Sequence, residues 1–272
     1  MNLEIITRQA VGTEQPAHIL FIHGGFHAAW CWSENFLPWF AERGWTSHAV
    51  SLRGHGGSDG AARMSEWGLK DYEEDVLRAV AQIGAPLVLI GHSMGGVIAQ
   101  RCWPKCGTAS AMVLLASSPR RVSMSVLARL TMSKPAAVVL GQLLGDMERA
   151  KPAYLEFFFS PSIQAATRAH YARQLGTESA RAVRELFSRS DLPVDICDRR
   201  AVLVIGGEKD WSIPLAEHQY LAETYRATLA VCPGAHDLML DADWNVTATT
   251  IDRWLREVFV RNQLDQQESA QL

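Results

Sequence analysis

The sequence predicts an α/β fold in which a mostly parallel, twisted sheet is flanked by helices. Short runs of branched apolar residues alternate along the chain with segments of helical periodicity. Continuous apolar runs are typical of strands that are buried on both faces, and their alternation with helices favours parallel order. One long interval without a strand further predicts a helical cap inserted into the sheet.

Each expected element follows from one of these local patterns. Strands are expected at Leu3–Thr7, His18–Ile22, Thr46–Leu52, Leu87–Ile90, Ala111–Leu115, Ala201–Ile205 and Thr228–Val231. Helices are expected at Trp32–Arg43, Trp67–Ile83, Gly95–Lys105, Leu215–Thr224 and Val246–Val260. Most strands lead into a Gly-rich turn or a helical pattern, as connections between parallel strands require.

The interval 118–192 breaks this alternation, because it shows only helical patterns. These lie at Val126–Met132, Ala136–Met147 and Ser162–Leu175. About 75 residues are too many for one connection in a compact domain, so we expect a helical cap there. The α/β core would then comprise residues 1–117 and 193–262, and the polar residues 263–272 would form a flexible tail.

Composition limits the class of protein. A chain of 272 residues with 48% hydrophobic residues can bury a substantial core, and its net charge of −3 offers no basic patch for nucleic acid or anionic lipid. No apolar stretch is long enough to span a membrane, and residues 1–13 show no secretory pattern. Five scattered cysteines favour reduced thiols. We therefore expect a cytoplasmic protein with a small-molecule ligand; the sequence leaves its oligomeric state open.

A G-x-S-x-G motif directly follows one expected strand. It runs from Gly91 to Gly95 with Ser93 at its centre, between the strand Leu87–Ile90 and a helix. The glycines allow neighbouring chain to pass close to a sharp turn. A serine at that turn projects its hydroxyl at the N-terminus of the helix, where free N–H groups favour negative charge. We predict that Ser93 is a nucleophile rather than an incidental serine in a Gly-rich turn.

An aspartate and a histidine follow the last two expected strands. Asp210 comes after Ala201–Ile205, and His236 comes after Thr228–Val231. Both therefore leave the sheet at the same edge as Ser93. A serine needs a base to take its proton, and the base needs an acid to hold its tautomer, in the chain order Ser, Asp, His. We predict His236 as the general base and Asp210 as the acid.

Other residues fit these roles less well. Glu208 follows its strand too soon to lie under the histidine, and Asp237 adjoins His236 and should point elsewhere. The strand after the nucleophile helix leads into Ala116–Pro119, which contains no carboxylate. Among nine histidines, His236 alone lies in a turn after a late strand. His92, beside the nucleophile, is assigned to packing and hydrogen bonding.

The loop after His18–Ile22 is expected to complete an oxyanion hole. Acyl transfer needs two preorganised donors for the developing oxyanion. We predict the backbone N–H groups of Met94 and Gly25. A metal site at His23 and His27 would need both on one helical face, and the glycines between them oppose a helix. We therefore expect neither a metal nor another cofactor.

With these motifs, the chain resembles the α/β-hydrolase superfamily over essentially its whole length. Residues 23–52 resemble the plant methyl-ester esterase and hydroxynitrile lyase branch, whose H-G-x-x-H-x-x-W-x-W pattern is matched at His23, Gly24, His27, Trp30 and Trp32. Residues 53–58 (RGHGGS) are instead similar to the R-G-H-G-x-S loop of bacterial esterases, C–C hydrolases and cofactor-free haloperoxidases. The resemblance implies an α/β-hydrolase fold with a nucleophile elbow and a catalytic triad.

Two departures from that branch bear on the reaction. Its cyanohydrin-cleaving enzymes have a threonine at the position of Gly24 and a lysine at the position of Asp237, which handle the cyanohydrin hydroxyl and the departing cyanide. This chain has neither residue. The resemblance therefore favours ester hydrolysis over the lyase reaction.

We expect a carboxylic ester hydrolase that forms an acyl-enzyme with a small or medium apolar substrate. Candidate substrate-binding residues are Phe26, Trp211, Leu127, Leu144 and Phe158. Three alternatives remain open at this stage. A thioesterase or acyltransferase would use the same triad, a C–C hydrolase or lyase would use the serine in another role, and a ligand sensor would use the fold without catalysis.

Overall fold

A computed structural model describes residues 1–119, 124–133, 141, 145–187, 198 and 200–270. Within these residues the sheet has seven strands in the order β1-β3-β2-β4-β5-β6-β7. β1 pairs antiparallel with β3, and every other neighbouring pair is parallel. The strands are β1 Ile5–Arg8, β2 His18–Ile22, β3 Ser47–Val50, β4 Leu87–His92, β5 Ala109–Leu115, β6 Ala201–Gly207 and β7 Thr228–Cys232. The predicted α/β fold with a mostly parallel sheet is confirmed.

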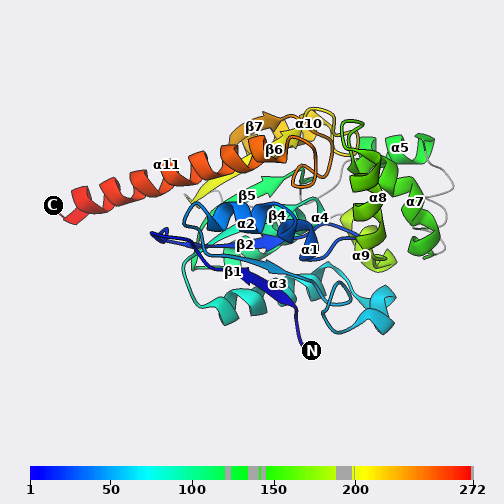
Figure 1. Cartoon of the computed structure of the whole chain (residues 1–272), viewed down its shortest axis with the longest axis horizontal. Coiled ribbons are helices and arrows are strands. Elements are labelled where there is room, and N and C mark those ends of the chain that lie inside the picture. Colours follow the sequence, from blue (N-terminus) through cyan, green and yellow to red (C-terminus); the bar gives the residue numbers. More distant parts are fainter. Residues whose placement is uncertain (120–123, 134–140, 142–144, 188–197, 199, 271–272) are drawn as a thin grey trace.

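Helices cover both faces of this sheet, and further helices gather beyond one end (Figure 1). Those of the core are α1 Trp30–Ser33, α2 Phe36–Ala41, α3 Leu69–Ile83, α4 Met94–Cys102, α10 Leu215–Tyr225 and α11 Trp244–Ala270. Those beyond the sheet are α5 Met124–Ser133, α7 Met147–Phe158, α8 Ala165–Gln174 and α9 Ala180–Phe187. We call residues 145–187, which include α7, α8 and α9, the described cap.

Alternate residues of the central strands build two separate layers of core. Phe21 of β2 and Val113 of β5 pack with α1, α2 and α11 on one face, whereas Leu20 and Leu114 pack with α3, α4 and α10 on the other. This follows from the two-residue period of a strand. Because both faces are covered by helices, the central strands consist of nearly continuous apolar residues.

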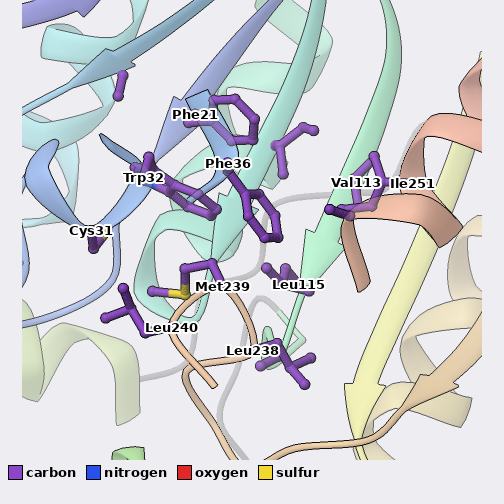
Figure 2. Packing of buried hydrophobic residues seen from close by; sticks show 14 of the residues in the cluster. Phe21, Cys31, Trp32, Phe36, Val113, Leu115, Leu238, Met239, Leu240 and Ile251 are labelled. Atoms are coloured by element: carbon purple, nitrogen blue, oxygen red, sulfur yellow. The ribbon is translucent and has the colours of Figure 1, made fainter. Parts of the chain in front are cut away.

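The first layer also fixes the chain that follows His236. Figure 2 shows Met239 beside Trp32, from α1, and Leu115, from β5, with Leu240 next to Met239 in the same core cluster. Leu238, Met239 and Leu240 are at most 2% exposed. Burial of three consecutive apolar side chains stabilises this segment by several kcal/mol, at about 1.5–3 kcal/mol per large side chain. The loop that carries His236 is therefore held by the core.

Prolines explain where two predicted helices differ from the observed ones. The expected helix Trp32–Arg43 is two helices, because Pro38 lacks the N–H that would bond four residues back in a continuous helix. The expected helix Gly95–Lys105 ends as α-helix at Cys102 and continues as a 3₁₀ turn that contains Pro104. Tertiary contacts still keep both segments close to the residue ranges that were predicted as helix.

The C-terminal helix is longer than predicted. We expected it to end at Val260, but α11 continues to Ala270, so that prediction is wrong. Residues 261–270 contain no glycine or proline, and most are good helix formers, so nothing in them ends a helix. In Figure 1 this part of α11 projects from the end of the molecule opposite the cap.

The described cap contains helices that the patterns did not predict. α9 and most of α7 lie outside the expected segments, and most of the expected helix Ala136–Met147 falls outside the described residues. The core and cap boundaries at 118 and 192 stay a proposal. No helix in the described part of the chain is long and apolar enough to cross a bilayer.

Candidate active site

Ser93 lies in the sharp turn between β4 and α4. Its backbone has φ 51° and ψ −119°, a conformation that costs a non-glycine residue on the order of 1–3 kcal/mol and concentrates at functional sites. The N–H of Ser93 donates to the carbonyl of Leu115 at 3.0 Å, which ties the turn to β5. A side chain at Gly95 would collide with the carbonyl oxygens of Ile22 and His23. The turn therefore lies directly against the end of β2.

His236 bridges Ser93 and Asp210. Its Nε2 lies 2.8 Å from Ser93 Oγ, and its Nδ1 lies 2.8 Å from Asp210 Oδ2. The other oxygen of Asp210 accepts the backbone N–H groups of Ser212 and Ile213 at 2.8 and 3.0 Å. Both carboxylate oxygens are thus fixed by hydrogen bonds, and the imidazole is held between acid and hydroxyl.

Burial and charge compete at His236. Burial alone lowers the pKa of this imidazole, but the charge of Asp210 and the hydrogen bond that Asp210 accepts outweigh burial and raise the pKa above 6.5. A raised pKa makes the imidazole a stronger acceptor for the hydroxyl proton. The electrostatic surroundings suit His236 to general acid–base chemistry.

The acids that sequence reasoning set aside lie elsewhere. Glu208 is exposed to solvent. Asp237 is buried, and its Oδ2 accepts a hydrogen bond from His27 Nε2 at 3.0 Å. Neither carboxylate takes the place of Asp210 beside the imidazole of His236.

His92 is hydrogen-bonded to the backbone of His236. Its Nε2 donates to the carbonyl oxygen of His236 at 3.0 Å, and the ring is 1% exposed. Burial is the largest of the effects that lower the pKa of His92 to about 3. The ring is therefore neutral at pH 7, and its proton sits on the nitrogen that faces the carbonyl.

A cavity of about 120 Å³ opens above Ser93. Gly25 and Met94, the predicted oxyanion donors, both line it. Its other described lining residues are Phe26, His27, His92, Ser118, Phe157, Phe158, Glu178, Val183, Leu186, Phe187, Ser212, Ile213 and His236. The loops after β2, β4, β5, β6 and β7 thus meet helices α7 and α9 around a mainly apolar space.

The predicted substrate-binding residues have different positions. Phe26 and Phe158 line the cavity. Trp211 lies behind the described lining, where its ring stacks on Phe157 at 4.2 Å with an angle of 10° between the planes. Leu144 and the side chain of Leu127 fall outside the described residues.

The sequence patterns missed a buried carboxylate at the cavity. Glu178 lies in the loop between α8 and α9, and its side chain is 0% exposed. It contacts His55 and Tyr72 of the core. Its run, Gly-Thr-Glu-Ser, has the composition of any turn before a helix. The motif around His55 indicates a family resemblance alone, so the sequence assigns neither residue a role.

The described residues contain no cluster of three or more histidine, cysteine, aspartate or glutamate side chains that could hold a metal ion. Cys31, Cys102, Cys106 and Cys232 are buried free thiols, and Cys197 lies outside the described part. Burial is the main cause that raises the pKa of all four thiols, so they are protonated near pH 7.

Comparison with known proteins identifies the family. A model of the alpha/beta hydrolase family matches residues 19–248. The chain is 33% identical over 91 residues to Esterase PIR7B of Oryza sativa subsp. japonica; this covers 32% of the chain and only 33% of the rice protein. An esterase from Exiguobacterium antarcticum has a TM-score of 0.72 at 16% identity, over 93% of this chain and 95% of that one. For the enol-lactonase of Burkholderia xenovorans LB400 the TM-score is 0.73, the identity 16%, and the coverage 93% and 96%. The chain belongs to the alpha/beta hydrolase family.

Proposed function

We propose that this protein hydrolyses a carboxylic ester of a small or medium apolar substrate through an acyl-enzyme. One observation carries the proposal. Ser93 Oγ, His236 and Asp210 form an unbroken series of hydrogen bonds that ends, at the hydroxyl, in an apolar cavity. The esterase names of a related rice protein and of a structural neighbour support the same reaction class.

The first half of the reaction transfers the acyl group to Ser93. Its Oγ attacks the carbonyl carbon while its proton passes to His236 Nε2. The tetrahedral intermediate then collapses, the bond to the alcohol oxygen breaks, and the alcohol leaves with the proton from Nε2. Asp210 stabilises the imidazolium that exists between these steps.

The second half returns the protein to its starting state. A water molecule gives a proton to His236 Nε2 as its oxygen attacks the acyl carbon. Collapse of this second intermediate breaks the bond to Ser93 Oγ, releases the acid and returns the proton to the serine. In both halves the N–H groups of Gly25 and Met94 receive the negative charge of the oxyanion. The triad and the two amides supply the whole reaction, so we propose that it needs no cofactor.

The cavity supports an apolar substrate of limited size. Its volume of about 120 Å³ lies below the range of about 300–1,000 Å³ that is usual for drug-sized ligands. Phe157, Phe158, Val183, Leu186, Phe187 and Ile213 present apolar surface to it. A short acyl or alcohol group would bury its apolar area there.

The surroundings of the triad disfavour the cyanohydrin-lyase alternative. A Cβ at Gly24 would lie 2.8 Å from His92 Nδ1 and 3.0 Å from Ser93 Cβ, so a threonine has no room there. Asp237, where the lyases have lysine, already pairs with His27. Position 237 therefore carries a carboxylate, which cannot receive a departing anion as the lysine of the lyases does.

A panel of p-nitrophenyl esters and matched thioesters of graded acyl length tests the proposal. We expect turnover of short and medium esters by the native protein. Ser93→Ala should lower kcat on the order of 10⁶-fold, because the triad acts as a unit. Multiple turnovers by Ser93→Ala would contradict the assignment of the nucleophile. Cleavage of thioesters alone would indicate a thioesterase, and a single slow turnover would indicate a ligand sensor.

A further inference from the structure

The peptide between Gly25 and Phe26 is held from both ends. Its carbonyl oxygen, on Gly25, lies 2.8 Å from His27 Nδ1. Its N–H, on Phe26, donates to Glu178 Oε2 at 3.2 Å. Phe26 has a φ of 67°, which is unfavourable for a residue with a side chain. External contacts therefore maintain a backbone conformation that the local sequence does not favour.

The described cap supplies two of these contacts. Glu178 accepts the N–H of Phe26, and the N–H of Gly176 donates to the carbonyl oxygen of Phe26 at 2.8 Å. Two residues of one cap loop thus hold the N–H and the carbonyl of one core residue. The core supplies the third contact, because His27 is itself anchored at 3.0 Å to the buried Asp237.

In this structure, both carboxylate oxygens of Glu178 accept hydrogen bonds from the core and from the loop of Glu178 itself. Oε2 accepts from Phe26 N and from His55 Nε2 at 3.1 Å. Oε1 accepts from Tyr72 Oη at 2.9 Å and from Ser179 N at 2.6 Å. The carboxylate is therefore an anchor for the loop and is not available to bind a substrate group.

The charge of Glu178 is balanced beside the oxyanion position. Both nitrogens of His55 face acceptors, Glu178 Oε2 and the carbonyl of Arg53 at 3.2 Å, so both must carry protons. Burial opposes this charge, but Glu178 raises the pKa of His55, and His55 lowers the pKa of Glu178 against the effect of burial. The pair is net neutral, so its effect on an oxyanion is mainly through the position of the loop.

We propose that Glu178 and Gly176 are positioning residues which set the Gly25 N–H for the oxyanion, so that the oxyanion hole is complete only with the cap loop seated on Phe26. This inference rests on the proposed function. Gly25 adjoins the clamped peptide, and an added Cβ at Gly25 would lie 3.5 Å from Glu178 Oε2. A displacement of about 1 Å at such a donor costs up to about 10²-fold in rate.

A pair of substitutions at Gly176 tests this without touching the carboxylate. Gly176→Pro removes the N–H that Phe26 accepts, and Leu175, with φ −67° and ψ 124°, already has the conformation required before proline. Gly176→Ala keeps the N–H, and its Cβ would have no neighbour closer than 3.9 Å. We expect kcat to fall by about 10-fold or more in Gly176→Pro and to change less than about 2-fold in Gly176→Ala.

Glu178→Gln tests the carboxylate. In the native protein, the backbone N–H groups of Phe26 and Ser179 donate to different carboxylate oxygens of Glu178. In the variant, one of these two N–H groups must therefore face the amide nitrogen of the glutamine. His55 can lose its proton and accept from that nitrogen, which leaves Phe26 without its acceptor. Tyr72→Phe is the matched control, because it removes the hydroxyl bond to Oε1 and the longer contact of the same hydroxyl with Met64 Sδ but leaves the acceptor of Phe26 in place. We expect a fall in kcat of about 10-fold for Glu178→Gln, with KM nearly unchanged, and less than about 2-fold for Tyr72→Phe.

Binding of an alkyl trifluoromethyl ketone gives a readout that a merely structural role would not move. Addition of Ser93 to the ketone places an oxyanion in the hole, whereas the matching alcohol fills only the cavity. Gly176→Pro and Glu178→Gln should weaken ketone binding by about 10-fold and leave alcohol binding unchanged. Unchanged ketone binding in folded Gly176→Pro would overturn the inference, and so would equal losses in Gly176→Ala. If Glu178→Gln does not fold, the Gly176 pair decides. Turnover that persists in Ser93→Ala would instead overturn the proposed function.

Discussion

At the scale of single residues, Asp210 determines both the orientation and the protonation of the proposed base. It accepts from His236 through one oxygen and from two backbone N–H groups through the other. The net effect is a His236 pKa above 6.5 despite burial. The proposed mechanism needs the neutral imidazole in the free enzyme, so kcat/KM should fall as the pH drops below this pKa.

Asp210→Asn should therefore change the pH profile as well as the rate. Without the carboxylate charge, burial dominates and the pKa of His236 falls. The acidic limb of kcat/KM should move to lower pH, and kcat should drop about 10⁴-fold through the wrong tautomer. Stopped-time assays from pH 4 to 9 with the best ester would measure both, with the exposed Glu208→Gln as control. An unmoved limb, or a larger loss in Glu208→Gln, would show that the acid is misassigned.

Sequence order could lead to Ser93, Asp210 and His236 because parallel strands bring their carboxyl ends to one edge of the sheet. The clamp on Phe26 could not be predicted in this way. Glu178 is 152 residues from Phe26 along the chain, and no periodicity or motif connects the two. Its position depends on how the cap loop packs on the core, which is a tertiary property.

At the scale of elements, the strands were predictable because their apolar runs have one physical cause, burial on both faces. β2 has the expected bounds, and the carboxyl ends of β4, β6 and β7 differ from expectation by one or two residues. α9 was missed because it is short and follows a polar turn; its Ala182 packs in the core, whereas its Val183 lines the cavity. The observed helix boundaries differ from the predicted ones at prolines, because a proline removes a backbone hydrogen bond locally.

The close packing of the turn between β4 and α4 leads to a prediction about stability. Gly95→Ala should lower the free energy of unfolding by about 1–3 kcal/mol or prevent folding, because its Cβ would collide with backbone oxygens that cannot move aside. Gly107→Ala, with nothing within 4 Å, should change it by less than about 0.5 kcal/mol. Urea unfolding of both variants measures the difference. Equal stabilities would contradict the close contact between this turn and β2.

At the scale of the whole molecule, buried neutral histidines link folding to pH. Burial is the largest cause that lowers the pKa of His218 to about 4 and of His48 to about 4. The unfolded chain binds protons near pH 6.5 at these sites, whereas the folded chain does not. Their contribution to stability is therefore complete above pH 6.5 and is lost as the pH falls toward 4. His55 has the opposite sign, because its pKa is raised in the folded state.

His218→Gln should reduce this acid sensitivity. The ring is 1% exposed and packs on Gly206, so its protonation at low pH opposes the folded state. Between pH 7 and pH 4 the variant should lose less unfolding free energy than the native protein, by on the order of 3 kcal/mol. Denaturant titrations across this range measure the slope. The exposed His170→Gln is the control, and identical slopes in all three proteins would refute the assignment.

Across the molecule, the loops at one end of the sheet and the described cap enclose Ser93, and the proposed acyl-enzyme is the central claim. Rapid quenching of the native protein during turnover of a short p-nitrophenyl ester, followed by mass spectrometry, tests it most directly. Because p-nitrophenolate leaves easily, deacylation should limit turnover and the acyl-enzyme should accumulate. The intact mass should rise by one acyl group, located on the peptide that contains Ser93, and His236→Ala should show no adduct. Turnover of the ester with no adduct, or with the acyl group on another residue, would contradict the account.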